Sequence, residues 1–482
     1  MYDELNPCQS YNMKRYTWRQ VDDVVLGSVA IKQAGEVYLP MPSGMRAVPP
    51  DGVASPTPKV FQQNKADYQS LYMPWYHPNP AYRAYLQRAR FPDITANTLR
   101  GLVGIATRKN PEVKLPAGME YMLEVATPCG KSLFELFAYC VSEVIKAGKI
   151  SLVLDVAEDG NMYIAPYTAL TNLNWKYKPI NGLKMLVSCT FEEDSDYDAD
   201  DVDGHMQYYL DDSQKAMVQK YVDGDTFGEP VELSYKGKVL NRLPIVHIGS
   251  VTNSAEPDLV PLLGMSDIAL EIYRDSADAS HARYLTCNPT LFISGIESEE
   301  VPKVIGSTVI VGLSNPAAKA YYPSTDTSAL EHIRSHIKDL FDEAVSYGGH
   351  FLGQQYKAES GEALKVRQSA NGATLIHIVN QVAKGISDVL MLAGEWASSS
   401  AEVVFEASTE FAEITLSAQD ITALVTSWVQ GGISQDTLLD NLRYAGIIDP
   451  DKTNDDEKSD IENSKPAIPA APAPGGVSGK PA

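Results

Sequence analysis

Two stretches decide the fold: PLLGMSDIALEIYRDSADASHARYL at residues 261–285 and SALEHIRSHIKDLFDEAVSY at residues 328–347. Apolar residues recur in both with the spacing of one helix face, so each is predicted to be a long amphipathic helix. Ser328 and Glu331 have the spacing of a capping box, and glycines at 348–349 predict the end of the second helix. Between the two helices, short β-rich stretches predict a small sheet at residues 291–296, 308–313 and 318–322.

The chain before this pair is predicted to mix helices with short strands. Helical patterning covers residues 82–108 and 133–147, and Gly148 has the residue type that ends a helix in a left-handed conformation. Short β-rich segments then alternate with turn signals. They lie at residues 150–156, 183–190, 217–222 and 243–248. The expected fold class is therefore α+β.

The two ends of the chain have a different composition. Residues 1–80 are rich in Pro and Tyr and are predicted to be an extended arm with short elements. A third long helix is expected at 363–396, followed by shorter helices at 417–430 and 434–444. Residues 449–482 are first acidic and then rich in Pro, Ala and Gly, so this tail is predicted to be disordered.

Composition and charge exclude several classes of protein. The 482 residues are 44% apolar and 21% charged, as in a globular protein of several domains, with a net charge of 40 − 62 = −22. Five scattered cysteines without a CxxC pair argue against a disulfide scaffold and a zinc site. No run approaches the roughly 20 apolar residues of a membrane span, and no signal peptide is evident, so we expect cytoplasmic synthesis. The acidic balance disfavours an open duplex-binding surface.

Three signals of enzyme or metal chemistry fail on inspection. Gly130-Lys131-Ser132 resembles the end of a phosphate-binding loop, but Val125 stands where that loop needs a glycine. Ser132 and Glu135 instead form a capping box. His332 and His336 share a helix face without a third metal ligand nearby. Residues 192–204 hold eight acids in thirteen, but not in the register of a calcium loop, so a solvated loop is expected, with loose cation binding as the alternative.

Two charged surfaces stand out. Asp267, Glu271, Asp275 and Asp278 fall within about 80° of one another at about 100° per residue, which fits either a solvated helix face or the lining of a pore. Residues 82–109 hold six basic side chains against Asp93 alone, a local charge of +5. Within that stretch Arg83, Arg88 and Arg90 are expected to contact an acidic neighbouring subunit, with DNA contact as the alternative.

The order of these elements resembles the portal (head–tail connector) protein of tailed bacteriophages. About 430 residues take part in the resemblance, which rests on several short sequence words in order. These are Asp22-Asp23, Gly27, Gly35 and Tyr38-Leu39-Pro40; Phe91, Thr98-Leu99 and Gly101-Leu102-Val103-Gly104; Leu154-Asp155, Ala165-Pro166-Tyr167 and Asn174-Trp175; the run ESGEALKVR at 359–367; and the stretch 432–446. The acidic tail after Asp449 departs from the family pattern.

The resemblance implies a division of the chain into the parts of a portal subunit. These are an N-terminal arm (1–80), a mixed α/β wing (81–260), a first stem helix (261–286), a small β clip (287–324), a second stem helix (325–350), a tunnel loop (351–362), a long wing helix (363–398), a helical crown (399–448) and the tail (449–482). In the tunnel loop, Gln354, Gln355, Tyr356 and Lys357 would lie nearest to DNA in the channel.

The resemblance also implies a function, which is structural. The chain would form a ring of about a dozen subunits at one capsid vertex, through which double-stranded DNA enters and leaves without sequence-specific contacts. Expected partners are the terminase large subunit, the head–tail adaptor, the scaffold and the major capsid protein. The location would be the virion, after assembly in the cytoplasm of a bacterial host. No enzyme activity, catalytic residue, metal, cofactor or membrane contact is expected.

Two alternatives come from other classes of protein. One is another virion ring, such as an adaptor or tail protein, although adaptors are much shorter and lack paired stem helices. The other is a nucleotide-dependent enzyme that uses Lys131 and Ser132. Nucleotide binding by the purified protein would favour this enzyme over the portal.

Overall fold

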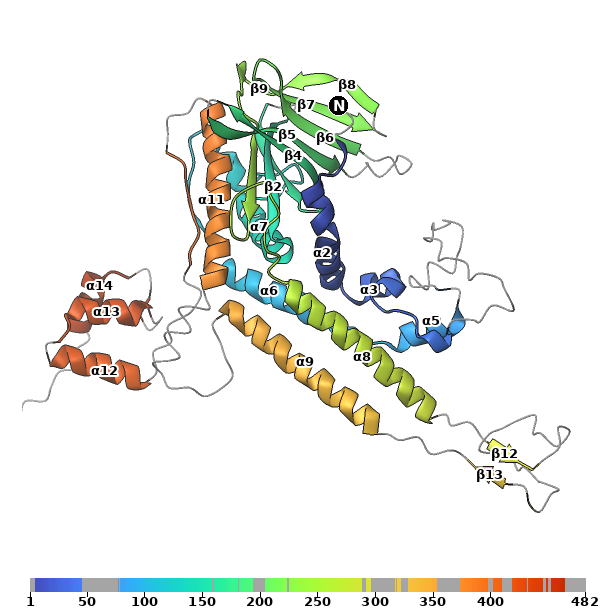
Figure 1. Ribbon diagram of the computed structural model, residues 1–482. Coiled ribbons are helices and arrows are strands. Elements are labelled where there is room, and N and C mark those ends of the chain that lie inside the picture. The colour runs from blue at the N-terminus through green and yellow to red at the C-terminus, as the bar shows by residue number, and fades with distance from the viewer. Residues whose placement is uncertain are drawn as a thin grey trace, which may run out of the picture. The chain divides into compact units, whose positions relative to one another are not determined.

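The computed structural model describes residues 5–45, 77, 79–157, 160–180, 182–193, 204–222, 225–287, 292–295, 317, 319–321, 328–352, 373–397, 402–409, 418–430, 432–444, 448–449 and 452–463. The chain divides into two compact units, Met1–Thr409 and Glu410–Ala482. Both helices and antiparallel sheets are present, so the fold is α+β as predicted (Figure 1).

The larger unit contains eight helices longer than one turn in its described part. They are α2 (Gln9–Leu26), α3 (Ser28–Ala34), α5 (Pro80–Arg88), α6 (Ile94–Ala106), α7 (Leu133–Ala147), α8 (Leu263–Cys287), α9 (Ser328–Leu352) and α11 (Ala373–Trp396), the last of which is central to the core. Short 3-10 turns lie at Gly35–Val37, Ser43–Met45 and Glu120–Leu123.

Two antiparallel sheets form the body of this unit. The first has the order β11-β2-β3, and the second is a meander in the order β4-β5-β6-β7-β8. Their strands are β2 (Lys149–Val156), β3 (Met162–Thr168), β4 (Asn172–Ile180), β5 (Leu183–Glu193), β6 (Gly204–Leu210), β7 (Ala216–Val222), β8 (Asp225–Glu232) and β11 (Ile245–Gly249). Three two-stranded pairs complete the set: β1 (Glu112–Lys114) with β14 (Val404–Glu406), β9 (Ser234–Tyr235) with β10 (Lys238–Val239), and β12 (Phe292–Ser294) with β13 (Lys319–Tyr321).

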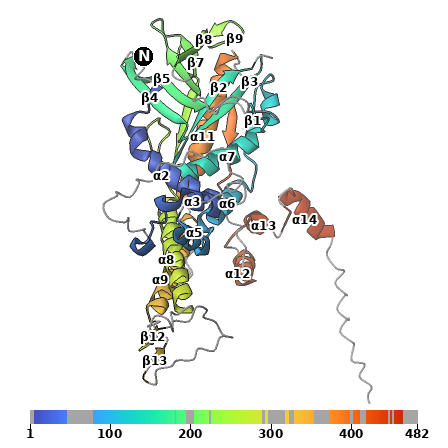
Figure 2. The same cartoon turned by 90° about the vertical axis from the view of Figure 1, so that its right-hand side faces the viewer.

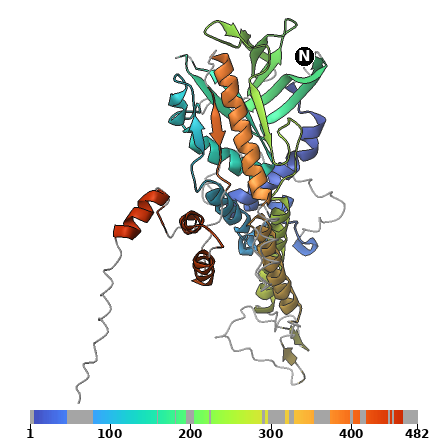
Figure 3. The same ribbon diagram turned by 90° about the vertical axis from the view of Figure 1, so that its left-hand side faces the viewer.

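Helix α11 packs on the three-stranded sheet and on α7 (Figure 3). By length and composition α11 could cross a membrane, but over half of it is buried, as in the core helix of a globular domain. Gly385 allows its close approach to β11, because a Cβ atom there would collide with Ile248. The sheet and the helix therefore form one core.

The predicted capping box of α7 is confirmed. The hydroxyl of Ser132 accepts from the backbone N–H of Glu135 at 3.2 Å, and the Glu135 carboxylate accepts from the backbone N–H of Ser132 at 2.8 Å. The helix ends at Gly148, whose φ of 75° is left-handed. A Cβ atom at Gly148 would also collide with the backbone of Leu259, so the chain needs glycine there for two reasons.

The prediction of an extended arm over residues 1–80 is wrong for its first half. Helix α2 has 18 residues, and it buries Tyr11, Trp18, Val21 and Val24 on one face. The prolines that indicated an arm begin only at Pro40, so nothing in α2 breaks the helix. Residues 46–76 lie outside the described residues.

One predicted helix boundary is also wrong, and the start of another predicted helix lies outside the described residues. Helix α9 continues through Gly348 and Gly349 to Leu352. Gly348 packs against Met265 and Thr98, and a single glycine costs a helix only about 1 kcal/mol, which such packing offsets. For the predicted helix at 363–396, the structure describes α11 from Ala373 onward, and residues 363–372 lie outside the described part.

The smaller unit contains α12 (Ala418–Val429), α13 (Gln435–Tyr444) and α14 (Asn454–Asn463). The first two confirm the predicted end helices, whereas α14 lies in the tail that was predicted to be disordered. Thr453 caps it, since its hydroxyl accepts from the N–H of Asp456 at 3.2 Å. Three acidic residues in its first turn stabilise the helix, because they lie at the positive end of the helix dipole. Lys458 also pairs with Asp436 of α13 at 2.5 Å. These local contacts explain the helix; residues 464–482 lie outside the described part.

Candidate functional site

Helices α8 and α9 form an antiparallel pair that extends away from the sheets (Figures 1 and 2). Strands β12 and β13 pair at the far end, where Phe292 stacks on Tyr321 with ring centroids 6.0 Å apart. At the near end, Gly264 of α8 lies so close to Tyr347 of α9 that a Cβ atom would collide with the ring. The two predicted helices and part of the predicted sheet between them are therefore confirmed.

The inner face of α8 belongs to the core. Ala269, Leu270, Tyr273 and Ala277 are buried in a cluster with residues of α2, α3 and α5. The opposite line of α8 is exposed at Asp267, Glu271, Arg274 and Asp278. The predicted apolar face of α8 is therefore the face that packs against the rest of the chain.

The four predicted stripe carboxylates share this helix face, and each has a partner within the chain. Asp267 accepts from the Gln20 amide at 2.6 Å, and Asp278 accepts from the Tyr85 hydroxyl at 2.5 Å. Glu271 and Asp275 lie 3.2 and 3.7 Å from His336 of α9. Burial, with the charges of Glu271 and Asp278, raises the pKa of Asp275, whereas His336 opposes this shift.

The stripe is therefore a line of acidic groups held by α2, α5 and α9. Asp267, Glu271 and Asp278 are exposed along this line. The assignment of these residues to a channel stays a prediction.

Arg88 and Arg90, two of the three arginines that are predicted to contact a neighbouring subunit, contact α8 of the same chain. The Arg88 guanidinium lies over the Tyr284 ring, 3.9 Å from its centroid, and 3.4 Å from Nδ1 of His281. The backbone N–H of Arg90 donates to Ser276 at 3.3 Å. Arg83 is half-buried on α5, whereas Arg90 is exposed. A contact between these arginines and a neighbouring subunit stays a prediction, and Arg88 is the least available for it.

The remaining candidate residues do not assemble into a site in the described part of the chain. Ser132 caps α7, and the Lys131 ammonium lies 4.8 Å from the centroid of the Tyr139 ring. His336 turns to the carboxylates of α8 rather than to His332. Among the described residues, no group of three or more His, Cys, Asp or Glu side chains could hold a metal ion.

Two predicted features fall outside the residues that the structure describes. The first is the tunnel-loop set Gln354, Gln355, Tyr356 and Lys357. The second is residues 194–203, most of the acidic loop considered for cation binding.

The structure adds a buried polar cluster that the sequence analysis missed. Ser151 and Nδ1 of His247 lie 2.8 Å apart, and the Asn172 amide donates to Ser151 at 3.0 Å. Lys149 donates to the carbonyl of Ala255 and lies 3.9 Å from the centroid of the Trp175 ring. Burial lowers the pKa of Lys149 to about 8 and that of His247 well below its usual range. The signal in the sequence is a lysine and a serine inside the apolar strand KISLVL.

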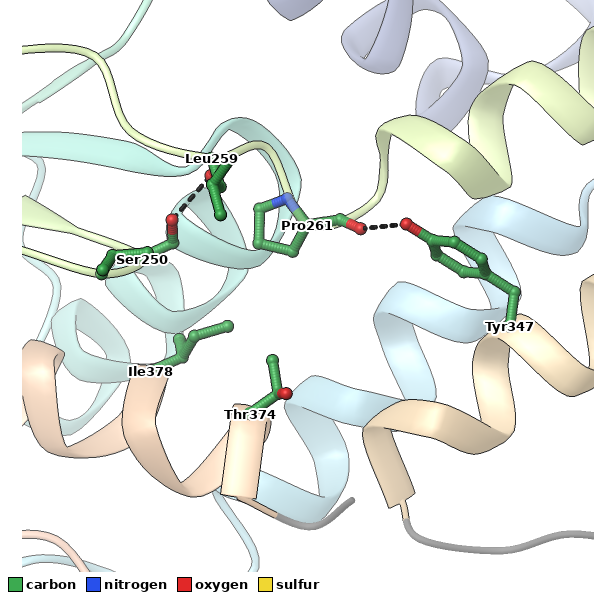
Figure 4. Close-up of a pocket in the computed structure, with 7 residues that line it drawn as sticks. Ser250, Leu259, Pro261, Tyr347, Thr374 and Ile378 are labelled. Atoms are coloured by element: carbon green, nitrogen blue, oxygen red, sulfur yellow. Dashed lines mark hydrogen bonds between the residues drawn. The ribbon is translucent and has the colours of Figure 1, made fainter. Parts of the chain in front are cut away.

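A cavity of about 340 Å³ was also missed (Figure 4). Its lining is mostly apolar and comes from the segment before α8, from α9 and from α11. The lining residues are Ser250, Val251, Leu259, Pro261, Tyr347, Thr374 and Ile378. These residues lie up to 128 positions apart, so no local sequence pattern could have indicated it.

Comparisons with known proteins give three results. Residues 261–397 match a family model described as a domain of unknown function, DUF4055. No curated protein matches the chain. Among solved structures, a chain from "Neck of empty GTA particle computed with C6 symmetry" is similar, with a TM-score of 0.35 and 11% identity over 74% of this chain and 90% of that one.

Proposed function

We propose that this chain is a portal subunit, which forms a ring-shaped channel at one capsid vertex for genome packaging and ejection. The observation that carries the proposal is the α8–α9 pair, joined through β12 and β13 and extended from an α+β body that contains α11 (Figure 2). This is the order of stem, clip, stem and wing helix that the sequence resemblance implies.

The surface of α9 supports a ring. Arg334, Lys338, Phe341 and Val345 are exposed and follow one another at helical spacing. Phe341 is 39% exposed and Val345 52%. Large apolar side chains beside charges on a projecting helix are typical of a surface that another chain covers. If the exposed residues of α9 met the acidic line of α8 on the next subunit, two different surfaces would be in contact. Such head-to-tail contacts between subunits can close into rings.

The acidic line of α8 supports a channel for DNA. Asp267, Glu271, Asp275 and Asp278 would repel phosphate at close range and so favour sliding over binding. At physiological salt this repulsion acts over about 8 Å, so only charges on the channel wall would contribute. In this function the ring would bind the terminase large subunit during packaging and the head–tail adaptor afterwards, and it would contact scaffold and major capsid protein in the virion.

The test of this function is the length of packaged DNA. Deletion of residues 354–358, or the substitution Lys357→Glu, would leave rings and procapsids intact but reduce packaging or retention, because the loop would lie nearest to the DNA. A matched control is Lys178→Glu, which makes the same charge change at an exposed lysine of β4, outside both the proposed tunnel loop and the basic stretch 82–109. Full-length, stably retained genomes in both loop variants would remove the loop from the mechanism.

A further inference from the structure

The cavity between α9, α11 and the segment before α8 is built to receive an apolar group. The Ser250 hydroxyl donates to the carbonyl of Leu259 at 2.6 Å, and the Tyr347 hydroxyl donates to that of Pro261 at 3.1 Å (Figure 4). The hydroxyls of Ser250 and Tyr347 thus donate to carbonyl groups of the cavity wall itself. What faces the space is mainly aliphatic and ring carbon, which favours an aliphatic occupant over a polar ligand.

One wall of the cavity is held in place before anything binds. The Asp258 carboxylate accepts from the backbone N–H groups of Val251 and Thr252 at 2.8 and 2.7 Å. The Asn253 amide donates to the carbonyl of Gln381 in α11 at 3.0 Å. A wall fixed at several points can bind an occupant without first paying the entropy of ordering.

The chain itself supplies a candidate occupant. Helix α9 ends at Leu352, five residues after Tyr347, and α11 begins at Ala373, next to Thr374. Both ends of residues 353–372 therefore lie beside the cavity. Twenty residues can span roughly 66–72 Å when fully extended, so this segment has ample length to leave the cavity and return to it.

The apolar content of this segment is concentrated at Leu364 and Val366. The cavity exceeds the roughly 150 Å³ of an engineered cavity that binds benzene, so it has room for the Leu364 side chain with Val366 beside it. Tyr356 is a poorer occupant because its hydroxyl would need a hydrogen-bond partner in a space that is lined mainly by carbon.

We infer that Leu364 docks into this cavity of its own chain and fastens residues 353–372 to the point where α8 begins, α9 ends and α11 begins. The inference concerns a single chain, so it does not depend on ring formation or on the proposed function. A rival arrangement is an α11 that begins ten residues earlier, which would carry Leu364 about 15 Å along the helix from Thr374.

The first test uses a photo-crosslinking amino acid, Leu364→benzoylphenylalanine, in the full-length protein mixed from 15N-labelled and unlabelled chains. We expect crosslinks to peptides that contain residues 250–261, over 100 positions away in sequence. The two peptides of each crosslink should be both labelled or both unlabelled. Crosslinks that join labelled to unlabelled chains would assign the cavity to a second copy and overturn the inference. Crosslinks confined to other peptides would overturn it as well.

The second test fills the cavity. Thr374 is exposed, so Thr374→Trp can place a ring there without disturbing the core. It should increase the rate of tryptic cleavage at Lys365 and Arg367 at least tenfold, as should Leu364→Asp. Met391→Trp, at an exposed position on the same helix away from the cavity, should leave the rate unchanged. Equal rates in all four proteins, wild type included, would contradict docking.

Discussion

Lys146 joins α2 to α7 through a buried group of charges. Its ammonium lies 2.8 Å from Asp22 and 2.8 Å from Glu143, whose side chain is only 7% exposed. Burial raises the pKa of Glu143, and Lys146 opposes that shift. Because a buried carboxylate without its cation is costly, the triad fastens α2 to α7 beside the apolar face that α2 buries.

The triad makes a prediction about stability. Lys146→Met should lower the free energy of unfolding by about 3 kcal/mol, since it leaves Glu143 charged and buried. Adding Glu143→Gln should recover part of that loss. Urea unfolding of both variants beside the wild type measures the effect, and a second substitution that only adds to the loss would show that Glu143 does not depend on Lys146.

Lys149 predicts a dependence of stability on pH. Its folded pKa of about 8 lies below the ordinary 10.5, so between these values the unfolded chain binds more protons and stability rises with pH. Over that window the gain is of order 3 kcal/mol, because each pKa unit corresponds to about 1.4 kcal/mol.

The measurement compares wild type with Lys149→Met. The difference in unfolding free energy between pH 8 and pH 10.5 should be larger for the wild type, since the variant keeps the other titrating groups but lacks this one. Identical pH profiles for the two proteins would mean that Lys149 is not held at a depressed pKa.

At the scale of elements, the exposed face of α9 predicts an assembly defect. Phe341→Asp with Val345→Asp should abolish rings while circular dichroism stays unchanged, because both side chains are exposed in a single chain. Val125→Asp is the matched control, since Val125 and Val345 are each 52% exposed. Rings formed equally well by the α9 variant would exclude this face as a subunit contact. Size-exclusion chromatography with light scattering gives the result.

Elements with local signals could be predicted from sequence. The capping box of α7, its end at Gly148 and the amphipathic faces of α8 each depend on residues a few positions apart. Strands β2, β5, β7 and β11 followed from composition and turns in the same way.

What the sequence analysis missed depends on distant contacts. Lys146 meets Asp22 across 124 positions, and the cavity wall joins residues from Ser250 to Ile378. Nothing near α2 in sequence shows that α7 will cover it. The prediction of a disordered tail is wrong because α14 has little apolar content and depends instead on its cap at Thr453 and on its ion pair with α13.

The whole molecule presents surfaces that a single chain leaves open. Phe341 and Val345 of α9 are exposed on the part that extends from the body, and so are Phe292 and Tyr321 of the β12–β13 pair. In a ring these faces would be covered by neighbouring copies, whereas the acidic line of α8 would face the channel.

The most direct measurement is the mass and shape of the purified full-length protein at micromolar concentration. Mass photometry should give a particle about a dozen times the 52.6 kDa chain, and negative-stain images should show a ring with a central hole. A single species of 52.6 kDa, with no ring in the images, would contradict the account.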